Sequence, residues 1–303
     1  MHALSLLARR ALAPLSLAVL GAASLGAAPT IAETIVVGGK NFTEQQIMAA
    51  MTSQLLEAKG YDVDTRAGMG SAVLREAQEA GQIDLYWEYT GTSLITYNKI
   101  EERMSPEDTY SKVKELDAEK GLTWLEPSAA NNTYAIAMRK DGAEEMGIAT
   151  ISDYAAAVNE DKGLTFASNA EFYARADGWK PLQEAYEFDM GRSDVKRMDS
   201  GLTYQALKEG QVDSALVFAT DGRNKAFDFT VLEDDKGYFP AYALTPVVRT
   251  ETLEANPELA DILNSLSAAL DDDTMATLNA RVDVERETIE DVASSFLQEQ
   301  GLV

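Results

Sequence analysis

The feature that most constrains the fold of this chain is a short internal repeat. Residues 81–84 are Gly-Gln-Ile-Asp and residues 210–213 are Gly-Gln-Val-Asp, and each segment follows a predicted helix. Five residues beyond each aspartate stands an aromatic residue, Tyr89 or Phe218, with a glycine turn soon after it. A repeated helix–strand–turn unit predicts a molecule with two similar halves.

Strands and helices alternate in both halves. After the first strand, Asn41 and Glu44 predict an N-cap and a capping box for a helix that closes at Gly60. The alternation predicts an α/β fold with mostly parallel strands. The predicted strands lie at 34–37, 61–66, 83–88, 122–125, 133–139, 164–167, 195–198 and in the segment that ends at 218, and helices are predicted at 71–80, 106–120, 153–158 and 178–186.

The C-terminal region predicts how the two halves are connected. From Pro257 onward the pattern indicates three helices with no strand between them, and these helices need a sheet to cover. We therefore expect the chain to cross into the second lobe near 135–140 and to return near 240. The predicted fold is α/β with two mixed sheets flanked by helices, in which residues 33–135 and 241–303 form lobe I, residues 136–240 form lobe II, and the two crossovers form a hinge beside a cleft.

The N-terminal residues predict export. Arg9 and Arg10 precede an uncharged stretch of small and apolar residues at 12–28, which is typical of a secretory signal peptide. We expect residues 1–32 to be removed by cleavage after Ala32. A membrane anchor is the alternative, but Pro14 and several Gly and Ala dilute the stretch. With no cysteine to carry a lipid, the prediction is a free periplasmic protein.

Composition excludes several classes of function. The 26 Lys and Arg against 50 Asp and Glu give a net charge of −24, so nucleic acid is not an expected partner. The only histidine is His2, inside the predicted signal, and there is no cysteine. Ser-His-Asp and Cys-His nucleophiles and zinc sites built on His or Cys are thereby excluded. Only all-oxygen sites for hard cations such as calcium remain, and no metal or cofactor is expected. The run 271–273 is predicted to be an acidic helix start and not part of a calcium loop.

Four aromatic residues are predicted to meet at the cleft. Tyr89 and Phe218 end equivalent strands, and in open α/β sheets the carboxyl ends of strands face the ligand crevice. Tyr134 stands at the first crossover and Tyr242 follows Pro240 at the second. Filling the core is the commoner role of aromatic rings. A quaternary ammonium group, however, has no hydrogen to donate and is recognised by ring faces, so the pattern predicts an aromatic cage.

These segments are similar to a known family, the glycine betaine/carnitine/choline-binding proteins of ABC-type osmoprotectant uptake systems. The similarity is carried by residues 38–45, 84–92, 131–135 and 204–222 in the same order and covers nearly the whole chain after residue 32. It implies a two-lobe periplasmic binding protein of type II-like fold, acting as a monomer with a membrane permease. It also implies that Tyr89, Tyr134, Phe218 and Tyr242 cage the ammonium group of glycine betaine, choline or a related betaine.

The positions that would hold the polar tail of such a ligand are less regular. The resemblance implies Lys40, Thr92 and Asn132, although many relatives carry glutamine in place of Lys40. That lysine either pairs with a ligand carboxylate or is simply solvated. Ser71, beside the glycines at 68 and 70, is a turn residue first and a tail contact second. Phe218 departs from the tyrosine common in the family and lacks its hydroxyl.

Three other functions remain as alternatives to the binding of a quaternary ammonium compound. One is a binding protein of the same fold for an amino acid or a polyamine, and another is a sensor that signals without uptake. The third is a periplasmic enzyme that uses carboxylates such as Glu88 and Asp221 on a cationic substrate. Asp221 and Arg223 are more simply explained as a structural ion pair, and residues 171–175 as packing within lobe II.

Overall fold

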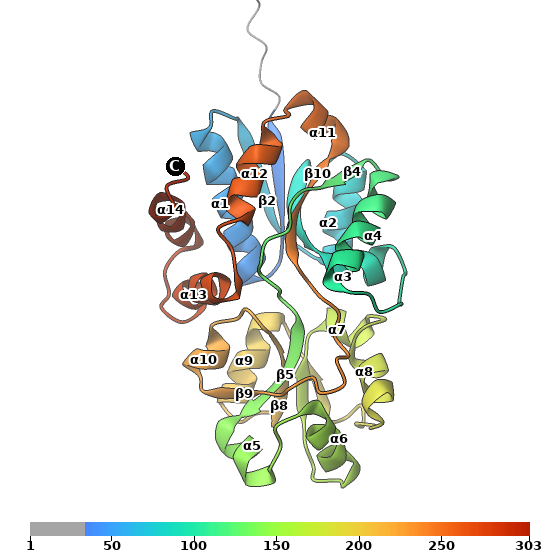
Figure 1. The fold of residues 1–303 in the computed structure, drawn as a ribbon. Helices are drawn as coiled ribbons and strands as arrows, with labels where there is room; N and C mark the ends of the chain where they lie inside the picture. The colour runs from blue at the N-terminus through green and yellow to red at the C-terminus, as the bar shows by residue number, and fades with distance from the viewer. Residues whose placement is uncertain (1–33) are drawn as a thin grey trace, which may run out of the picture. The chain divides into compact units, whose positions relative to one another are not determined.

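The structure is a computed structural model that describes residues 34–303. The predicted signal segment, residues 1–32, and its cleavage site after Ala32 lie outside these residues. The described residues belong to one compact unit, Glu33–Val303. This unit is built around two mixed sheets of five strands, which confirms the predicted α/β class with two mixed sheets. Figure 1 shows helices flanking both sheets.

The first sheet is built from the beginning of the chain and one later strand. Its strand order is β2-β1-β3-β10-β4. β1 pairs in parallel with β2 and β3, whereas β10 is antiparallel to both of its neighbours. The strands are β1 (Ile35–Lys40), β2 (Val63–Met69), β3 (Leu85–Tyr89), β4 (Leu122–Trp124) and β10 (Leu244–Arg249).

The second sheet repeats this plan, with the strand order β7-β6-β8-β5-β9. β6 pairs in parallel with β7 and β8, and β5 is antiparallel to both β8 and β9. In each sheet the fourth strand of the order is therefore the antiparallel one. The strands are β5 (Tyr134–Arg139), β6 (Phe166–Ser168), β7 (Val195–Arg197), β8 (Ser214–Phe218) and β9 (Phe229–Val231).

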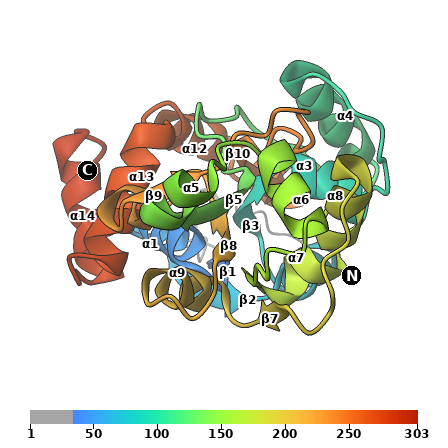
Figure 2. The same ribbon diagram turned by 90° about the horizontal axis from the view of Figure 1, so that it is seen from below.

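The helices cover both faces of each sheet. Figure 2 shows the second sheet from below, with α9 on one side and α6 and α8 on the other. Side chains along β5 alternate accordingly: Ile136 packs in the cluster under α6 and α8, and Ala137 packs under α9.

The helices are α1 (Thr43–Ala58), α2 (Ser71–Glu79), α3 (Thr90–Thr92), the π-helix η1 (Ser93–Tyr97), α4 (Pro106–Ala118), α5 (Lys140–Met146), α6 (Ile151–Asn159), α7 (Ala170–Ala174), α8 (Trp179–Tyr186), α9 (Ser200–Lys208), α10 (Arg223–Ala226), α11 (Thr250–Ala255), α12 (Leu259–Ser267), α13 (Asp272–Asp283) and α14 (Ile289–Glu299).

The expectation of mostly parallel strands is wrong in one respect. Half of the strand pairings are antiparallel, and all of these involve β5 or β10. The reason is that each of these strands enters its sheet from a crossover and so runs against its neighbours (Figure 1). β10 was not expected as a strand because Pro246 stands inside it, opposite Trp87, where a proline cannot donate a ladder hydrogen bond.

The two crossovers lie side by side between the sheets. Asn131 and Ala243 form an isolated antiparallel bridge, and the Asn132 amide donates to the Tyr242 carbonyl oxygen at 3.1 Å. After the second crossover the chain completes the first sheet and adds α12, α13 and α14, so the three predicted C-terminal helices are confirmed. Asp271 caps α13 by accepting a hydrogen bond from the Thr274 amide, as expected for an acidic helix start.

The internal repeat has the same structural role in both sheets. The Asp84 carboxylate accepts a hydrogen bond from the Val36 amide at 2.8 Å, and the Asp213 carboxylate accepts one from the Thr165 amide at 2.9 Å. Gly81 before the first aspartate adopts a φ of +73°, a conformation that favours glycine. In each half the repeat thus ties the start of one strand to the parallel strand beside it in the sheet, β3 to β1 and β8 to β6. No helix among residues 34–303 is long and apolar enough to cross a membrane.

Candidate functional site

A pocket lies where the ends of strands from the two sheets face each other. Its lining contains every residue predicted from the sequence to contact ligand, from both sheets and both crossovers. Three further residues that were not predicted also line it: Phe42, Asn169 and Glu171. The eight predicted residues in the lining are Lys40, Ser71, Tyr89, Thr92, Asn132, Tyr134, Phe218 and Tyr242.

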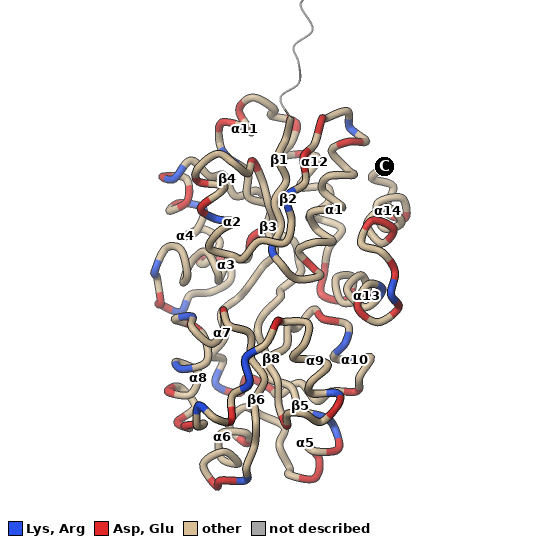
Figure 3. Tube along the Cα trace, turned by 180° about the vertical axis from the view of Figure 1, so that it is seen from behind, with Lys and Arg blue, Asp and Glu red and all other residues tan. Residues whose placement is uncertain are grey.

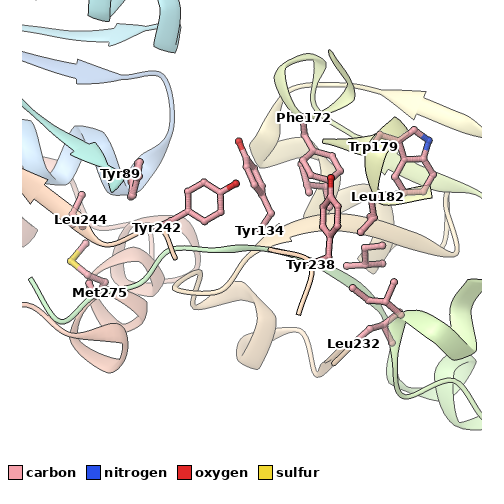
Figure 4. Packing of buried hydrophobic residues seen from close by; sticks show 14 of the residues in the cluster. Tyr89, Tyr134, Phe172, Trp179, Leu182, Leu232, Tyr238, Tyr242, Leu244 and Met275 are labelled. Carbon is pink, nitrogen blue, oxygen red and sulfur yellow. The ribbon is translucent and has the colours of Figure 1, made fainter. Parts of the chain in front are cut away.

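The four predicted rings are placed by strand ends and by the second crossover. Tyr89 is the last residue of β3, and Phe218 is the last residue of β8, as the repeat predicted. Tyr134 begins β5 and lies directly opposite Phe218 in the ladder. Tyr242 stands just before β10, and Figure 4 shows its ring between those of Tyr89 and Tyr134.

The rings pack at angles that leave some of their faces toward the pocket. The centroids of Tyr134 and Phe218 are 5.4 Å apart, and Tyr134 meets Tyr242 edge-on at 5.6 Å. Tyr89, Tyr134 and Tyr242 belong to the large buried cluster as well as to the pocket lining, so they contribute to both. Rings fixed by packing on one side can present a preorganised face on the other.

Phe42 is a fifth ring of the pocket, which the sequence interpretation left without a role. It stacks on Phe218 with a centroid distance of 5.3 Å and an interplanar angle of 10°, and on Tyr89 at 6.3 Å and 23°. It follows the carboxyl end of β1, a parallel strand. The rule that located Tyr89 and Phe218 at strand ends therefore also applies to this position.

Hydrogen bonds fix the orientation of two tyrosines. The Tyr89 hydroxyl donates to Glu44 at 2.7 Å, and the Tyr242 hydroxyl donates to Asp177. Burial, together with the neighbouring Glu44 carboxylate, raises the pKa of Tyr89 well above its usual value. Both hydroxyls thus remain protonated donors, and the rings cannot rotate without breaking these bonds.

Lys40 is buried beside the Tyr89 ring. Its Nζ lies 2.5 Å from Glu88 Oε1 and 4.9 Å from the centroid of the Tyr89 ring, and its side chain is 2% exposed. The alternative of a simply solvated lysine is therefore wrong. Glu88, at 0% exposure, also accepts hydrogen bonds from the Tyr86 hydroxyl and the Tyr89 amide. A buried ion pair of this kind needs such extra hydrogen bonds to offset the loss of hydration.

Arg175 is the second buried cation at the site. Its guanidinium makes a bidentate pair with Asp177, at 2.6 and 2.7 Å, and donates to Thr92 Oγ1 at 3.3 Å. The guanidinium carbon lies 5.4 Å from the Tyr134 ring centroid and 5.9 Å from that of Tyr242. Arg175 therefore joins the second half of the chain to the first at the edge of the pocket.

The expectation that residues 171–175 serve only lobe packing is thus wrong in part. Phe172 does pack, at 4.9 Å from Tyr134, but Glu171 lines the pocket and its Oε2 accepts a hydrogen bond from Ser71 at 3.0 Å. A close turn brings this segment to the cleft. A Cβ at Gly178 would stand 1.8 Å from the Phe172 carbonyl oxygen, so the turn requires glycine. Charged residues next to a packing phenylalanine were the signal available in the sequence.

The remaining polar residues offer donors and acceptors at the pocket wall. Thr92 lies in the short helix α3, which follows β3, and Asn132 lies in the first crossover. The Asn132 side chain donates to Glu44 at 2.7 Å, while its Oδ1 is buried without a partner among the described residues. Ser71 is the first residue of α2 and lines the pocket.

Glu44 does not form the predicted capping box. The N-cap of α1 is Phe42, and it has no side-chain cap hydrogen bond. The Glu44 carboxylate is instead buried and accepts hydrogen bonds from Tyr89, Asn132, Thr220 and Asn279. Burial raises the pKa of Glu44, and the four hydrogen bonds oppose this effect. The glutamate of the Asn-x-x-Glu pattern therefore accepts hydrogen bonds at the cleft and does not cap the helix.

The carboxylates considered for catalysis are engaged in structural contacts. Glu88 is held by Lys40 and Tyr86, and Asp221 pairs with Arg223 at 2.5 Å, which confirms the expected structural ion pair. Asp221 does not belong to the pocket lining.

Comparisons with known proteins agree with this geometry. Residues 33–299 match the OpuAC family, described as the substrate binding domain of ABC-type glycine betaine transport system. The chain is 47% identical to a glycine-betaine-binding protein of Pseudomonas aeruginosa, over 90% of this chain and 89% of that protein. It is 33% identical to the glycine betaine-binding protein YehZ of Escherichia coli, over 89% of this chain and 92% of YehZ.

Solved structures show the same architecture. A structure described as a glycine betaine/carnitine/choline ABC transporter superposes with a TM-score of 0.72 at 28% identity, covering 88% of this chain and 99% of that one. The family match extends over almost all of the described residues, including both sheets and the pocket between them. The chain therefore belongs to the OpuAC family of substrate-binding domains of ABC-type glycine betaine transport systems.

Proposed function

We propose that this protein binds a betaine, a small molecule with a quaternary ammonium group and a carboxylate, for uptake by an ABC transporter. The observation that carries the proposal is the pocket lined by five aromatic rings from both sheets and a crossover. Family membership supports it, because the family consists of substrate-binding domains, so the chain is a binding protein and not an enzyme. The names of the two relatives above support glycine betaine as the first ligand to test.

The rings suit a cation that cannot donate hydrogen bonds. Each ring face set against such a cation contributes about 0.5–2 kcal/mol, so several faces together give a free energy sufficient for micromolar binding. The proposed cage consists of Tyr89, Tyr134, Phe218 and Tyr242, with Phe42 stacked between Tyr89 and Phe218. An amino acid or polyamine carries N–H donors and would need carboxylates in place of ring faces.

The polar wall suits a carboxylate tail. Lys40 lines the pocket and the Arg175 guanidinium lies next to Thr92, so two buried cations stand near the cage. Each is partly neutralised by an acidic partner, Glu88 or Asp177, which leaves donors for a ligand carboxylate without an excess of positive charge. We therefore propose that a zwitterionic betaine binds more tightly than choline, with Thr92, Asn132 and Ser71 as further polar contacts.

The proposed role in transport follows the family. We propose that the protein is exported by cleavage after Ala32, acts as a periplasmic monomer and delivers its ligand to a permease in the inner membrane. We further propose that lobe I comprises residues 33–135 and 241–303 and that lobe II comprises residues 136–240. The lobes would close on the ligand by bending at the crossovers, because contacts made by both lobes favour the closed form.

Calorimetry with a ligand panel tests the proposal. Residues 33–303 are titrated with glycine betaine, carnitine, choline, proline and putrescine, each up to millimolar concentration. We expect heat and a raised melting temperature with glycine betaine, weaker binding of choline, and no binding of putrescine. The absence of any signal with all three quaternary ammonium compounds would refute the proposal, and a response to proline or putrescine alone would favour a different solute.

A further inference from the structure

Glu44 is a buried carboxylate that touches the cage but does not line the pocket. Its four hydrogen-bond donors come from four separate places in the chain. Tyr89 ends β3 and donates at 2.7 Å, and Asn132 in the first crossover also donates at 2.7 Å. Asn279 on α13 donates at 3.2 Å, and Thr220 in the turn after β8 donates at 2.5 Å. Only the Thr220 donor belongs to the second sheet's side of the cleft.

The turn that carries Thr220 is docked against α13. Figures 1 and 3 both show α10, which follows the turn, next to α13. Asn279 donates to the Thr220 carbonyl oxygen at 3.0 Å, and Arg223 pairs with Asp283 at 3.2 Å. A Cβ at Gly222 would stand 2.4 Å from the Ala276 carbonyl oxygen. The contact therefore leaves no room for a side chain at this glycine.

The Glu44–Thr220 hydrogen bond differs from two hydrogen bonds that cross the cleft at the pocket wall. Ser71 with Glu171 and Thr92 with Arg175 involve residues of the pocket wall, so a ligand competes with or adds to those bonds. Glu44 and Thr220 are both absent from the pocket lining, and both are almost fully buried. A ligand does not replace their hydrogen bond, so the bond contributes to closure whether or not ligand is present.

We propose that Glu44 is a positioning residue that couples the cage to lobe closure: its carboxylate orients Tyr89 and Asn132 and gains its fourth donor only when the turn 220–223 docks on α13. This inference rests on the proposed function, since it assumes that the pocket binds a ligand when the lobes close. In an open form the Thr220 hydroxyl leaves, and the carboxylate keeps the donors Tyr89, Asn132 and Asn279. Apparent affinity then scales with the fraction of molecules in which the turn is docked.

The central test removes one hydroxyl from the second side of the cleft. Thr220→Val keeps the shape of the side chain and deletes the donor, whereas Thr220→Ser retains the donor. Thr277→Val on the exposed side of α13 is the matched control, because its hydroxyl bonds only the Asp273 carbonyl oxygen among the described residues. We expect the glycine betaine Kd to rise about tenfold in Thr220→Val and to change less than about twofold in the other two variants.

Closure is measured in the same variants with and without ligand. The natural chain has no cysteine, so Lys180→Cys on α8 and Glu251→Cys on α11 provide two unique and exposed sites for spin labels. We expect Thr220→Val to shift the label distances toward the open form even without ligand. An unchanged distance distribution and an unchanged Kd in Thr220→Val, with a melting temperature showing that the variant is folded, would overturn the proposal.

A double-mutant cycle separates positioning from general packing. Tyr89→Phe removes a second of the four donors to Glu44 and keeps the ring. If Glu44 couples the two residues, the effects of Tyr89→Phe and Thr220→Val on Kd are not additive, whereas independent packing roles give additive effects. If the wild-type protein binds no quaternary ammonium compound, the proposed function fails, and the label distances without ligand still decide on the role of Glu44.

Discussion

At the scale of single residues, the site consists of ring faces and of charges that are already paired. Each of the two cations near the proposed cage, Lys40 and Arg175, has its own carboxylate partner. The tyrosines are held through their hydroxyls by Glu44 and Asp177. The folded protein therefore already holds these side chains in place, and ligand binding does not have to offset the entropy of ordering them. Such preorganisation favours tight binding of a small solute.

Removal of one cage ring should weaken binding strongly. In Tyr242→Ala a ring face and its packing against Tyr134 are lost, and we expect the Kd for glycine betaine to rise about tenfold or more, as measured by calorimetry. Leu202→Ala, at an exposed apolar position on α9, is the control and should bind as the wild type does. Equal affinity of Tyr242→Ala and wild type would exclude this ring from the cage.

The Lys40–Glu88 pair allows a stability prediction. Lys40→Met leaves the Glu88 carboxylate buried without its cation, and we expect a loss of about 3–5 kcal/mol in the free energy of unfolding, measured by urea denaturation. The double variant Lys40→Met with Glu88→Gln removes both charges and should recover most of the loss. If the single variant were as stable as the wild type, the pair would have no structural role.

At the scale of elements, α4 is fastened to its neighbours by one carboxylate. Asp117 accepts hydrogen bonds from Arg75 on α2, Ser93 in η1 and Trp124 in β4. Burial alone would raise the pKa of Asp117, but the hydrogen bonds and the charge of Arg75 lower it to about 2. This residue therefore links three elements around the end of the first sheet.

The lowered pKa of Asp117 predicts acid sensitivity. The ionised group adds stability above its unfolded pKa of 3.8, and that contribution is lost as the pH falls through about 2. The difference amounts to about 2 kcal/mol. We expect Asp117→Asn to be less stable than wild type at pH 7 by urea denaturation and to lose less stability between pH 4 and pH 2. Parallel pH curves for the two proteins would contradict this assignment.

Most elements could be predicted from the sequence, because helix caps and strand-end glycines are local signals. Helix α4 begins at Pro106, the predicted start, with Ser105 as its N-cap, and Tyr89 and Phe218 end their strands as the repeat indicated. Two features depended on tertiary contacts instead. β10 contains a proline and is recognisable only once its neighbours β3 and β4 are known. The carboxylate of Glu44 turns from the helix start to the cleft, where four donors from distant segments compensate its burial.

The candidate site was predictable to the same extent. All eight proposed contacts line one pocket, because strand ends and crossovers are fixed by the order of the elements. The sequence prediction missed Arg175 and Glu171, which a close turn brings to the cleft. That turn depends on the close approach of Gly178 to Phe172. Such an approach does not show in the hydrophobic pattern that predicts helices and strands. Phe42 was overlooked although it obeys the strand-end rule.

At the scale of the whole molecule, the two sheets share one topology, in which the fourth strand of the order is antiparallel to its neighbours. Arg249 at the end of β10 lies 3.4 Å from Asp84, and Arg139 at the end of β5 lies 4.0 Å from Asp213. The same aspartates anchor the strand starts in both halves. The end of β10 thus lies near Asp84 and the end of β5 lies near Asp213. The opposite ends of these two strands, where Tyr242 and Tyr134 stand, are therefore beside the cleft.

Ligand binding should change the size of the molecule if the lobes close around it. We expect small-angle X-ray scattering to give a smaller radius of gyration with saturating glycine betaine than without it. Gly222→Ala should abolish most of this change, because a methyl group at this position would meet the Ala276 carbonyl oxygen and the Ala280 side chain of α13. A compaction of Gly222→Ala equal to that of the wild type would show that the turn does not dock during closure.

The position of β10 in the first sheet also sets the sequence of events during folding. All five strands of the second sheet lie between Tyr134 and Val231, so this sheet can assemble as soon as that stretch is available. The first sheet is completed by β10, which is inserted between β3 and β4 and follows every strand of the second sheet in the chain. In a chain that emerges from its N-terminus, we therefore expect the second sheet to form before the first sheet is completed.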